Sequence, residues 1–476
     1  MAIIPKKIKI VATMGPALAR EGMLRKALMA GVDVFRLNFS HGTPESHRSA
    51  AAAIREEARA LGLAVGILGD LQGPKIRIGK FADGSAMLRP GQRFELREDP
   101  ELGSEDFVGL DYKPLLEEAF PGDILVLDDG KMRLRVIERQ PGKLVTEAMV
   151  AGRLSNHKGI NRLGGGLSAA ALTQKDFADI ELAASIGVDF LAVSFPKSGA
   201  DMREARQLLA AQGSKAWLVA KIERKEAIDN LDEIIEASDG IMVARGDLAL
   251  EVGDAQVPAL QKRMIGAARS AKRFSITATQ MLESMIEAST PTRAEVSDIA
   301  NAVFDGTDAV MLSAESATGA YPIEAIEAMS RVAEEAGKQT GLLAADEPQG
   351  QLDRRDHVVA IAAIAAARHS KASSIVSMTS SGGCPLWLSR SNLAQPILAF
   401  SPDPEAVQKM SILRGVACAM LEIGEGSTFE QAWPSIERAL LDREWARRGE
   451  QVIVTFGEPM GSVGGTDSLK MARISD

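Results

Sequence analysis

Polar side chains follow several short apolar runs of this chain, and their types suit the transfer of a phosphoryl group. Arg36, Asn38 and Ser40 close one run at alternate positions, and Lys221 and Glu223 close another. Alternate residues of a strand share a face, so these side chains can converge. Other runs end in further candidates: Asp70, Asp247, Thr277, Thr279, Ser313 and Glu315. The sequence therefore predicts one ring of cations, carboxylates and hydroxyls.

Such a ring has the parts that phosphoryl transfer needs. Glu223 and Asp247 can give carboxylate oxygens to an octahedral Mg²⁺, which completes its shell with water and substrate. Lys221 and Arg36 can neutralise charge on the moving phosphoryl group, which is the main catalytic task in this class of reaction.

Each candidate also has a structural interpretation. A single Lys or Arg is usually solvated or salt-bridged at the surface. Asp247 can cap a helix, Thr279 can form a turn, and Ser313 with Glu315 can start a helix. The repetition at six strand ends favours the functional interpretation.

The runs that must position this ring alternate with longer helical stretches, a pattern typical of parallel strands joined by helices. Eight such strands close a TIM barrel, whose active site lies at the carboxyl ends of its strands. The predicted strands are Lys9–Ala12, Val34–Asn38, Val65–Leu68, Phe190–Ser194, Trp217–Ile222, Gly240–Ala244, Phe274–Ala278 and Ala309–Leu312.

One interval, residues 73–167, breaks this rhythm and reads as short alternating strands. Turn pairs separate them: Asp83-Gly84, Pro90-Gly91, Pro121-Gly122, Asp129-Gly130 and Pro141-Gly142. We expect an all-β domain of barrel type inserted after the third barrel strand. That loop lies on the catalytic face, where an inserted domain can act as a lid.

A fresh α/β alternation occupies residues 346–476, with predicted strands near Ser374–Met378, Pro396–Phe400, Val416–Leu421 and Val452–Thr455. The expected fold class is thus α/β: a (β/α)8 TIM barrel formed by residues 1–72 and 168–345, with the inserted all-β lid and a C-terminal α/β domain.

Composition agrees with a multidomain enzyme and argues against other classes. The chain has 476 residues and a formal net charge of -9, which opposes general attraction to nucleic acid or to anionic lipid. Two cysteines, Cys384 and Cys418, are too few for a disulfide scaffold. The N-terminus lacks the features of a signal peptide, and Val358–Ala367 is far shorter than the ~20 residues of a membrane span. We expect a cytoplasmic protein.

Longer motifs carry a resemblance that covers essentially the whole chain. The chain resembles the pyruvate kinases in the stretches Arg36–Gly42, Gly69–Arg77, Lys221–Glu223, Asp239–Asp247, Ala278–Met285, Pro291–Asp298 and Asn301–Gly306. This resemblance implies conversion of phosphoenolpyruvate and ADP into pyruvate and ATP, the last step of glycolysis.

The resemblance also implies residue roles. Lys221 would stabilise the transition state, Glu223 and Asp247 would bind Mg²⁺, and Thr279 would lie near the path that protonates the enolate carbon. The phosphoenolpyruvate site would comprise Arg36, Lys221, Gly246, Asp247 and Thr279. The nucleotide, arriving with a second Mg²⁺, would meet Arg77, Lys158, His41 and Asn38.

The chain departs from the family pattern at a monovalent-cation site. Many members hold K⁺ with the counterparts of Asn38, Ser40, Asp70 and a threonine that is Leu71 here. A glutamate of those members is replaced by Lys75. Our hypothesis is that the Lys75 ammonium supplies the charge of K⁺, so that K⁺ is not required. The alternative is that Lys75 is solvated and K⁺ still binds.

A C-terminal loop suggests regulation. Residues Thr379, Ser380, Ser381, Gly382 and Gly383 form a predicted strand-to-helix turn, and Gly457–Gly465 is rich in glycine. Their amides and hydroxyls suit a phosphate, and the family uses this loop for sugar-phosphate or nucleotide effectors such as AMP. Cys384-Pro385 departs from the family pattern, so the effector stays open, as does a plain turn. The resemblance further implies a homotetramer.

Two other functions stay open. One is a different Mg²⁺-dependent barrel enzyme of phosphoenolpyruvate or pyruvate, such as an aldolase or mutase, against which Lys158 and Arg77 argue. The other is an inactive homologue that only binds an effector. Retention of Lys221, Glu223, Asp247 and Thr279 argues against it, because an inactive copy has no chemical need for them.

Overall fold

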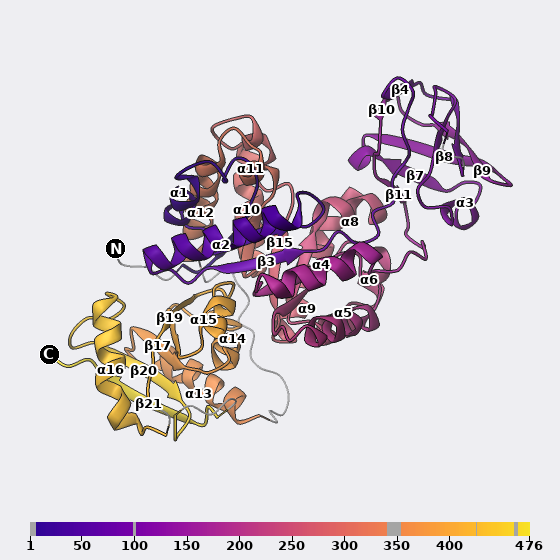
Figure 1. Cartoon of the computed structure of the whole chain (residues 1–476). Helices are drawn as coiled ribbons and strands as arrows, with labels where there is room; N and C mark the ends of the chain where they lie inside the picture. The colour runs from indigo at the N-terminus through magenta and orange to yellow at the C-terminus, as the bar shows by residue number, and fades with distance from the viewer. Residues whose placement is uncertain (1–5, 99–100, 340–353, 425, 461–464) are drawn as a thin grey trace.

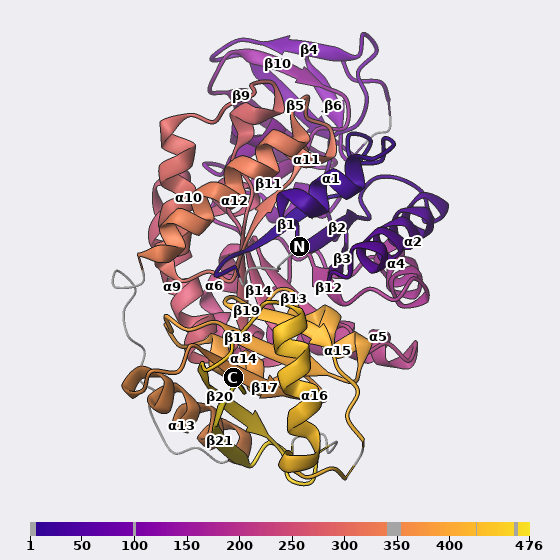
Figure 2. The same cartoon turned by 90° about the vertical axis from the view of Figure 1, so that its left-hand side faces the viewer.

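Three bodies follow one another along the molecule: an inserted β domain, a central barrel and a C-terminal α/β domain (Figures 1 and 2). The computed structural model describes residues 6–98, 101–339, 354–424, 426–460 and 465–476. None of the helices in these ranges combines the length and apolarity needed to cross a lipid bilayer.

The central body is a closed barrel of eight parallel strands, which confirms the predicted fold class. Around the barrel the strands follow the order β1-β16-β15-β14-β13-β12-β3-β2. Their bounds are β1 (Lys9–Thr13), β2 (Val34–Asn38), β3 (Gly66–Asp70), β12 (Phe190–Val193), β13 (Trp217–Ile222), β14 (Gly240–Ala244), β15 (Phe274–Ala278) and β16 (Ala309–Leu312).

Helices surround the barrel. They are α1 (Met23–Ala30), α2 (Pro44–Leu61), α4 (Gln174–Ser185), α5 (Gly199–Ala211), α6 (Lys225–Asp229), α7 (Leu231–Ala237), α8 (Arg245–Val252), α9 (Val257–Ser270), α10 (Arg293–Asp305), α11 (Ala314–Ala317) and α12 (Pro322–Lys338), with the 3₁₀ turns η2 (Asp254–Gln256) and η3 (Glu283–Ile286).

Both faces of each barrel strand are buried, which is why all eight read as continuous apolar runs. Val11, Leu68 and Phe274 point into the barrel, whereas Ile10 and Ile67 pack against the surrounding helices. The interior-facing series continues along each strand to its carboxyl end. Side chains that extend this series therefore emerge together at one mouth of the barrel.

The lid domain is inserted between β3 and β12, as predicted, and projects from one end of the barrel in Figure 2. A six-stranded sheet of order β11-β7-β8-β9-β5-β6 and a separate pair β10-β4 build it. Its elements are β4 (Ser85–Leu88), β5 (Arg93–Arg97), β6 (Phe107–Gly109), α3 (Leu115–Glu118), β7 (Ile124–Leu127), η1 (Asp128–Gly130), β8 (Met132–Gln140), β9 (Lys143–Ala148), β10 (Gly152–Ser155) and β11 (Ile160–Arg162). The short helix α3 is an addition to the all-β expectation.

The C-terminal domain is a five-stranded sheet of order β19-β18-β17-β20-β21. Its last strand, β21, pairs antiparallel with β20 and was not predicted. The elements are α13 (Arg355–His369), β17 (Ser374–Met378), α14 (Gly383–Ser389), β18 (Ile397–Ser401), α15 (Pro404–Met410), β19 (Val416–Met420), α16 (Phe429–Asp442), β20 (Gln451–Phe456) and β21 (Ser468–Arg473).

The C-terminal domain packs against the barrel at the end opposite the lid (Figure 2). Apolar side chains from inside the barrel and from the C-terminal sheet form one continuous core. A buried ion pair between Arg390 and Asp308 joins the two bodies, with Nη1 of the arginine 2.8 Å from Oδ2. This end of a TIM barrel serves stability, so the catalytic mouth is left to the lid side.

Candidate active site

Four charged side chains meet inside the mouth of the barrel. Nε of Arg36 lies 2.6 Å from Oδ2 of Asp70, and Nζ of Lys221 lies 3.3 Å from Oδ1 of the same carboxylate. Lys221 also lies 2.9 Å from Oε1 of Glu223. The strands β2, β3 and β13 carry these groups at their carboxyl ends. The predicted convergence of cations and carboxylates is therefore present for this part of the ring.

Burial and charge set the protonation of this cluster. Burial opposes the charge on Lys221, but Asp70 and Glu223 outweigh it and raise the pKa of the ammonium group. Burial also opposes the Asp70 carboxylate, yet Lys221 and Arg36 hold its pKa below the usual range. Burial raises the pKa of Glu223 to about 7, with Lys221 opposing the shift and Asp247 adding to it. A further cation beside Glu223 would favour its ionised form.

Two buried carboxylate oxygens of the cluster can still bind a metal ion. Oδ1 of Asp70 and Oε1 of Glu223 are buried and face the Lys221 ammonium at 3.3 and 2.9 Å, but neither contact has hydrogen-bond geometry. Among the described residues, no group of three or more His, Cys, Asp and Glu side chains could hold a metal alone. Mg²⁺ needs fewer protein ligands, because it commonly binds one or two carboxylates and takes its other ligands from water and substrate. Glu223 and Asp247 fit that requirement.

Thr279 has a strained backbone that places its hydroxyl at the mouth. Its φ is +68°, which a β-branched residue rarely adopts. Arg245 holds the conformation by donating from Nη2 to the Thr279 carbonyl at 2.5 Å while pairing with Asp298 at 2.8 Å. The Thr279 hydroxyl accepts the amide of Gly246 at 2.9 Å. Maintained strain of this kind is typical of functional sites.

Two members of the predicted ring, Thr277 and Glu315, do not join it, and that part of the prediction was wrong. Thr277 is fully buried, with its hydroxyl 3.0 Å from that of Thr307 and away from the charged cluster. The carboxylate of Glu315 accepts a hydrogen bond from the amide of Ser313, two residues earlier, at 2.7 Å. Because Ser313 directly precedes α11, the helix-start interpretation is correct for Glu315.

Sequence reasoning missed three residues that hold the cluster. The hydroxyl of Thr13 accepts from Nη1 of Arg36 at 3.1 Å. The Ser194 hydroxyl accepts from Lys221 at 2.8 Å and donates to the Leu71 carbonyl at 2.7 Å. The amide of Phe195 donates to Oε2 of Glu223 at 3.0 Å. Ser194 directly follows a strand, so the rule that found the others could have found it.

Comparison with known proteins agrees with this geometry. The family model for the pyruvate kinase barrel domain matches residues 5–326, and the model for the pyruvate kinase alpha/beta domain matches residues 357–472. The chain belongs to the pyruvate kinase family. A member of this family is an enzyme that transfers phosphoryl groups, which agrees with the cations and carboxylates that meet at the barrel mouth.

Individual relatives match over nearly their whole length. Pyruvate kinase of Haemophilus influenzae is 48% identical over 461 residues, which cover 95% of this chain and 96% of the relative. Pyruvate kinase II of Salmonella typhimurium is 46% identical, with 98% of this chain and 99% of the relative covered. Pyruvate kinase of Mycobacterium tuberculosis is 38% identical, with 98% of each chain covered.

The candidate nucleotide residues of this pyruvate kinase family member fall into two groups. Arg77 and Lys158 are neighbours in the lid, where Arg77 donates to the His157 carbonyl at 2.9 Å and Lys158 pairs with Asp128 at 2.6 Å. His41 and Asn38 belong to the barrel mouth. Within the described residues, no hydrogen bond or ion pair joins the two groups. A nucleotide would have to bridge them.

The candidate monovalent-cation residues cluster more closely. Asn38 lies beside Asp70 in the register of β2 and β3, and its Oδ1 accepts the Ser40 amide at 3.1 Å. The Leu71 side chain is buried in the core, so only its carbonyl could act as a ligand. Lys75 lines a cavity together with Asp247, at the junction of barrel and lid.

Two glutamates of the barrel, the buried Glu251 and the half-buried Glu226, hold the segment by which the lid returns to it. The Glu251 carbonyl accepts the amide of Gly164 at 2.7 Å, and its Oε2 accepts the amide of Lys225 at 2.9 Å. Oε1 of Glu226 accepts the amide of Gly166 at 2.5 Å. Burial raises the pKa of Glu251 to about 7, with the Lys225 amide opposing the shift and the Glu226 charge adding to it.

Replacing Glu251 by glutamine is expected to stabilise the protein at alkaline pH. The folded protein holds the Glu251 proton more tightly than the unfolded chain, so its contribution to the free energy of unfolding falls as pH rises from 4.5 to about 7. Glutamine removes this loss and keeps an acceptor for the Lys225 amide. We expect Glu251→Gln to add about 1 to 3 kcal/mol above neutral pH and little near pH 4.5.

Thermal unfolding of wild type and variant across this pH range measures the effect. Glu233→Gln, at an exposed glutamate of α7, is the control. It should change the unfolding midpoint neither near pH 4.5 nor above neutral pH. An equal shift of the Glu251→Gln midpoint at all pH values would contradict the assigned pKa.

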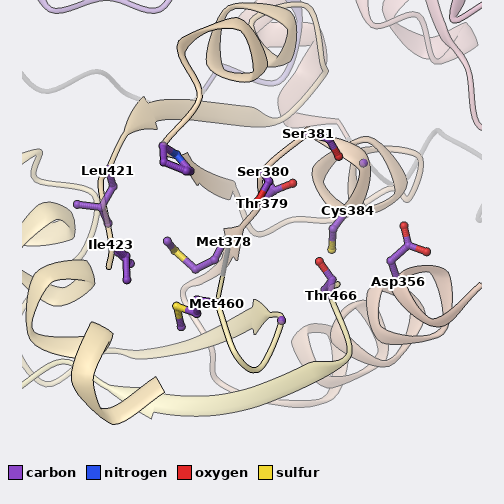
Figure 3. Close-up of a pocket in the computed structure, with 13 residues that line it drawn as sticks. Asp356, Met378, Thr379, Ser380, Ser381, Cys384, Leu421, Ile423, Met460 and Thr466 are labelled. Carbon is purple, nitrogen blue, oxygen red and sulfur yellow. The ribbon is translucent and has the colours of Figure 1, made fainter. Parts of the chain in front are cut away.

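The candidate effector loop lines a pocket in the C-terminal domain (Figure 3). Thr379, Ser380, Ser381 and Gly383 contribute to it, while Gly382 has a φ of +83° and its amide donates to the Thr379 hydroxyl at 3.0 Å. The buried Asp356 also faces the pocket, and no lysine or arginine is among its described lining residues. Of the glycine-rich segment Gly457–Gly465, residues 461–464 lie outside the described residues.

Proposed function

We propose that this member of the pyruvate kinase family transfers the phosphoryl group of phosphoenolpyruvate to ADP, giving pyruvate and ATP. One observation carries the proposal. The Lys221 ammonium is held inside the barrel mouth between two carboxylates, at 3.3 Å from Asp70 and 2.9 Å from Glu223, with Arg36 beside them. Fixed positive charge in a buried site is the main requirement of phosphoryl transfer.

The chain's own side chains divide the work. Lys221 and Arg36 neutralise the charge that develops on the phosphoryl group as it leaves the enolate oxygen. Gly246 and Thr279 bind the substrate at the amino-terminal end of α8, where the helix dipole favours a carboxylate. The strained Thr279 holds its hydroxyl beside the path by which the enolate carbon gains its proton. Thr13 and Ser194 position the two cations.

Glu223 and Asp247 are the proposed ligands of one Mg²⁺. Bound there, the ion would polarise phosphoryl oxygens as a Lewis acid. The two carboxylates supply the negative charge for it, and Oε1 of Glu223, which faces the Lys221 ammonium at 2.9 Å, has a further lone pair that can coordinate the ion.

The nucleotide, with its own Mg²⁺, is proposed to lie between the lid and the barrel. Arg77 and Lys158 would approach it from the lid, and His41 and Asn38 from the barrel. A lid that must close on the nucleotide excludes water while the phosphoryl group moves, which prevents its loss by hydrolysis. Phosphoryl transfer that depends on ADP separates this function from an aldolase or mutase.

We further propose that the enzyme does not require K⁺. Lys75 adds a fixed positive charge at the barrel–lid junction, beside the cavity that Asp247 also lines. A resident ammonium group lowers the local demand for a monovalent cation.

Pyruvate formation from phosphoenolpyruvate, ADP and Mg²⁺, measured in K⁺-free buffer and again with K⁺, tests both statements. We expect comparable rates in the two buffers. Lys75→Glu should lose about tenfold or more of the K⁺-free rate and regain it with K⁺. Activity of the wild type only with K⁺ would reject the role of Lys75, and no activity in either buffer would reject the function.

We also propose that an effector controls the enzyme, that it assembles as an oligomer and that it is located in the cytoplasm. The hydroxyls of Thr379, Ser380 and Ser381 favour a sugar-phosphate or AMP effector, while the charge of Asp356 opposes a phosphate close to it. Adding sugar phosphates or AMP to the assay tests this. A cytoplasmic homotetramer follows from the family resemblance, and light scattering of the purified chain tests the number of subunits.

A further inference from the structure

A cavity of about 200 Å³ lies where the C-terminal domain meets the barrel. Lys7, just before β1, lines it from the barrel side. Arg414 and the loop that links α14 to β18 line it from the C-terminal domain, the loop contributing Ser391 and Gln395. We name this space the junction cavity. Its described lining contains two cations and no carboxylate.

The guanidinium group of Arg414 is buried and forms no ion pair with any described residue. The residue is 6% exposed, and its Nη1 donates to the Gly306 carbonyl at 2.9 Å. No carboxylate forms an ion pair with its guanidinium group in the part of the chain that the structure describes. Burial lowers the pKa of Arg414 to about 10, despite the opposing influence of Asp308. A buried charge in this situation is costly unless something pairs with it.

Both oxygens of Asp308, the acid whose charge favours the charged form of Arg414, already accept their full number of hydrogen bonds. Arg390 donates to both of its oxygens, the Ser275 amide donates to Oδ2 at 2.9 Å, and the Arg414 amide donates to Oδ1 at 3.1 Å. Each oxygen thus accepts two hydrogen bonds, which is the capacity of a carboxylate. Asp308 therefore has no lone pair left for the guanidinium group of Arg414.

Lys7 brings a second positive charge to the same cavity. Its carbonyl accepts the Gly415 amide at 2.9 Å, which ties the lysine to the residue that follows Arg414. Burial and the charge of Arg414 lower the pKa of the Lys7 ammonium. Two cations that repel each other across a partly desolvated space create a favourable position for an anion between them.

We propose that the junction cavity binds a small oxyanion, a carboxylate or a phosphate group, held between Lys7 and Arg414. The neighbouring Leu393, Pro396 and Ile397 provide apolar surface, so the ligand can carry a short apolar body. The site is distinct from the barrel mouth, which lies at the other end of the barrel, and from the loop at Thr379–Gly383, whose described lining holds no cation. Because both domains contribute a charge, the bound anion would strengthen their contact.

Calorimetric titration of the full chain tests the site with two probes, isobutyrate and inorganic phosphate, each raised to tens of millimolar. Binding of isobutyrate alone would identify a carboxylate ligand, and binding of phosphate alone a phosphorylated one; both outcomes support the site if they depend on Lys7 and Arg414. Absence of heat with either probe would overturn the proposal.

Two variants locate the binding. Arg414→Gln and Lys7→Gln should each weaken it by about tenfold or more, the loss expected for one charged hydrogen-bond partner. Lys7→Gln keeps the proposal testable if Arg414→Gln does not fold. Lys371→Gln, at an exposed lysine of the C-terminal domain, makes the same charge change elsewhere and should bind like the wild type. Unchanged affinity in Lys7→Gln would assign the binding to another site and overturn the proposal.

Discussion

Replacing Lys221 by methionine is expected to lower kcat by about three orders of magnitude, within the range found when a fixed cation is removed from a phosphoryl-transfer site. Methionine fills a similar volume but has no charge to place against the phosphoryl group. Its loss also leaves Asp70 and Glu223 facing each other without the ammonium between them. Because the interaction is strongest in the transition state, kcat and kcat/KM should fall together.

Steady-state kinetics with phosphoenolpyruvate and ADP measure this loss, and thermal unfolding shows whether the variant keeps its fold. Lys225→Met is the matched control: the residue is exposed four positions further on, at the start of α6, and its substitution should leave kcat unchanged. A decrease of less than about tenfold in Lys221→Met would mean that another group stabilises the transition state.

The barrel could be predicted because its strands are buried on both faces and so read as apolar runs. The remaining error lies at the strand ends. The sequence pattern ended the third strand at Leu68, but β3 continues through Asp70, because Arg36 and Lys221 neutralise that carboxylate inside the barrel. A charged residue at the end of a buried strand suggests that the strand stops before it. Only the oppositely charged side chains of other strands show that the residue still belongs to the strand.

Thr279 illustrates a limit of spacing arguments. Strand alternation would place Thr277 and Thr279 on one face, yet the first points away from the mouth and the second toward it. The positive φ of Thr279 breaks the alternation, and Arg245, the first residue of α8, maintains this conformation. Such a conformation depends on a tertiary contact and has no local sequence signal.

The local sequence predicts the turns of the lid well but does not predict the last strand. The five turn pairs of the lid were predictable since their glycines all adopt positive φ, which glycine accommodates without strain. Strand β21 has no such signal. It is an antiparallel edge strand in which Lys470 and Met471 are both exposed, so no apolar alternation marks it. Only pairing with β20 makes it a strand.

Glu223 is the second position where a single change should have a large effect. Glu223→Gln keeps the shape of the side chain and the acceptor for the Phe195 amide but removes the charge proposed to bind Mg²⁺. Losing several kcal/mol of metal stabilisation corresponds to a decrease in kcat of roughly a thousandfold. The half-saturating Mg²⁺ concentration should rise as well, and Asp247→Asn should behave in the same direction.

Direct metal binding separates this role from a structural one. Titration with Mn²⁺, followed by electron paramagnetic resonance in the absence of nucleotide, should show weaker binding in Glu223→Gln than in the wild type. Glu233→Gln, the exposed control on α7, should bind Mn²⁺ normally. If Glu223→Gln bound Mn²⁺ as the wild type does and still lost activity, the residue would act by holding Lys221 in place. Its partners at the barrel mouth, Asp70 and Asp247, would then have to supply the metal ligands.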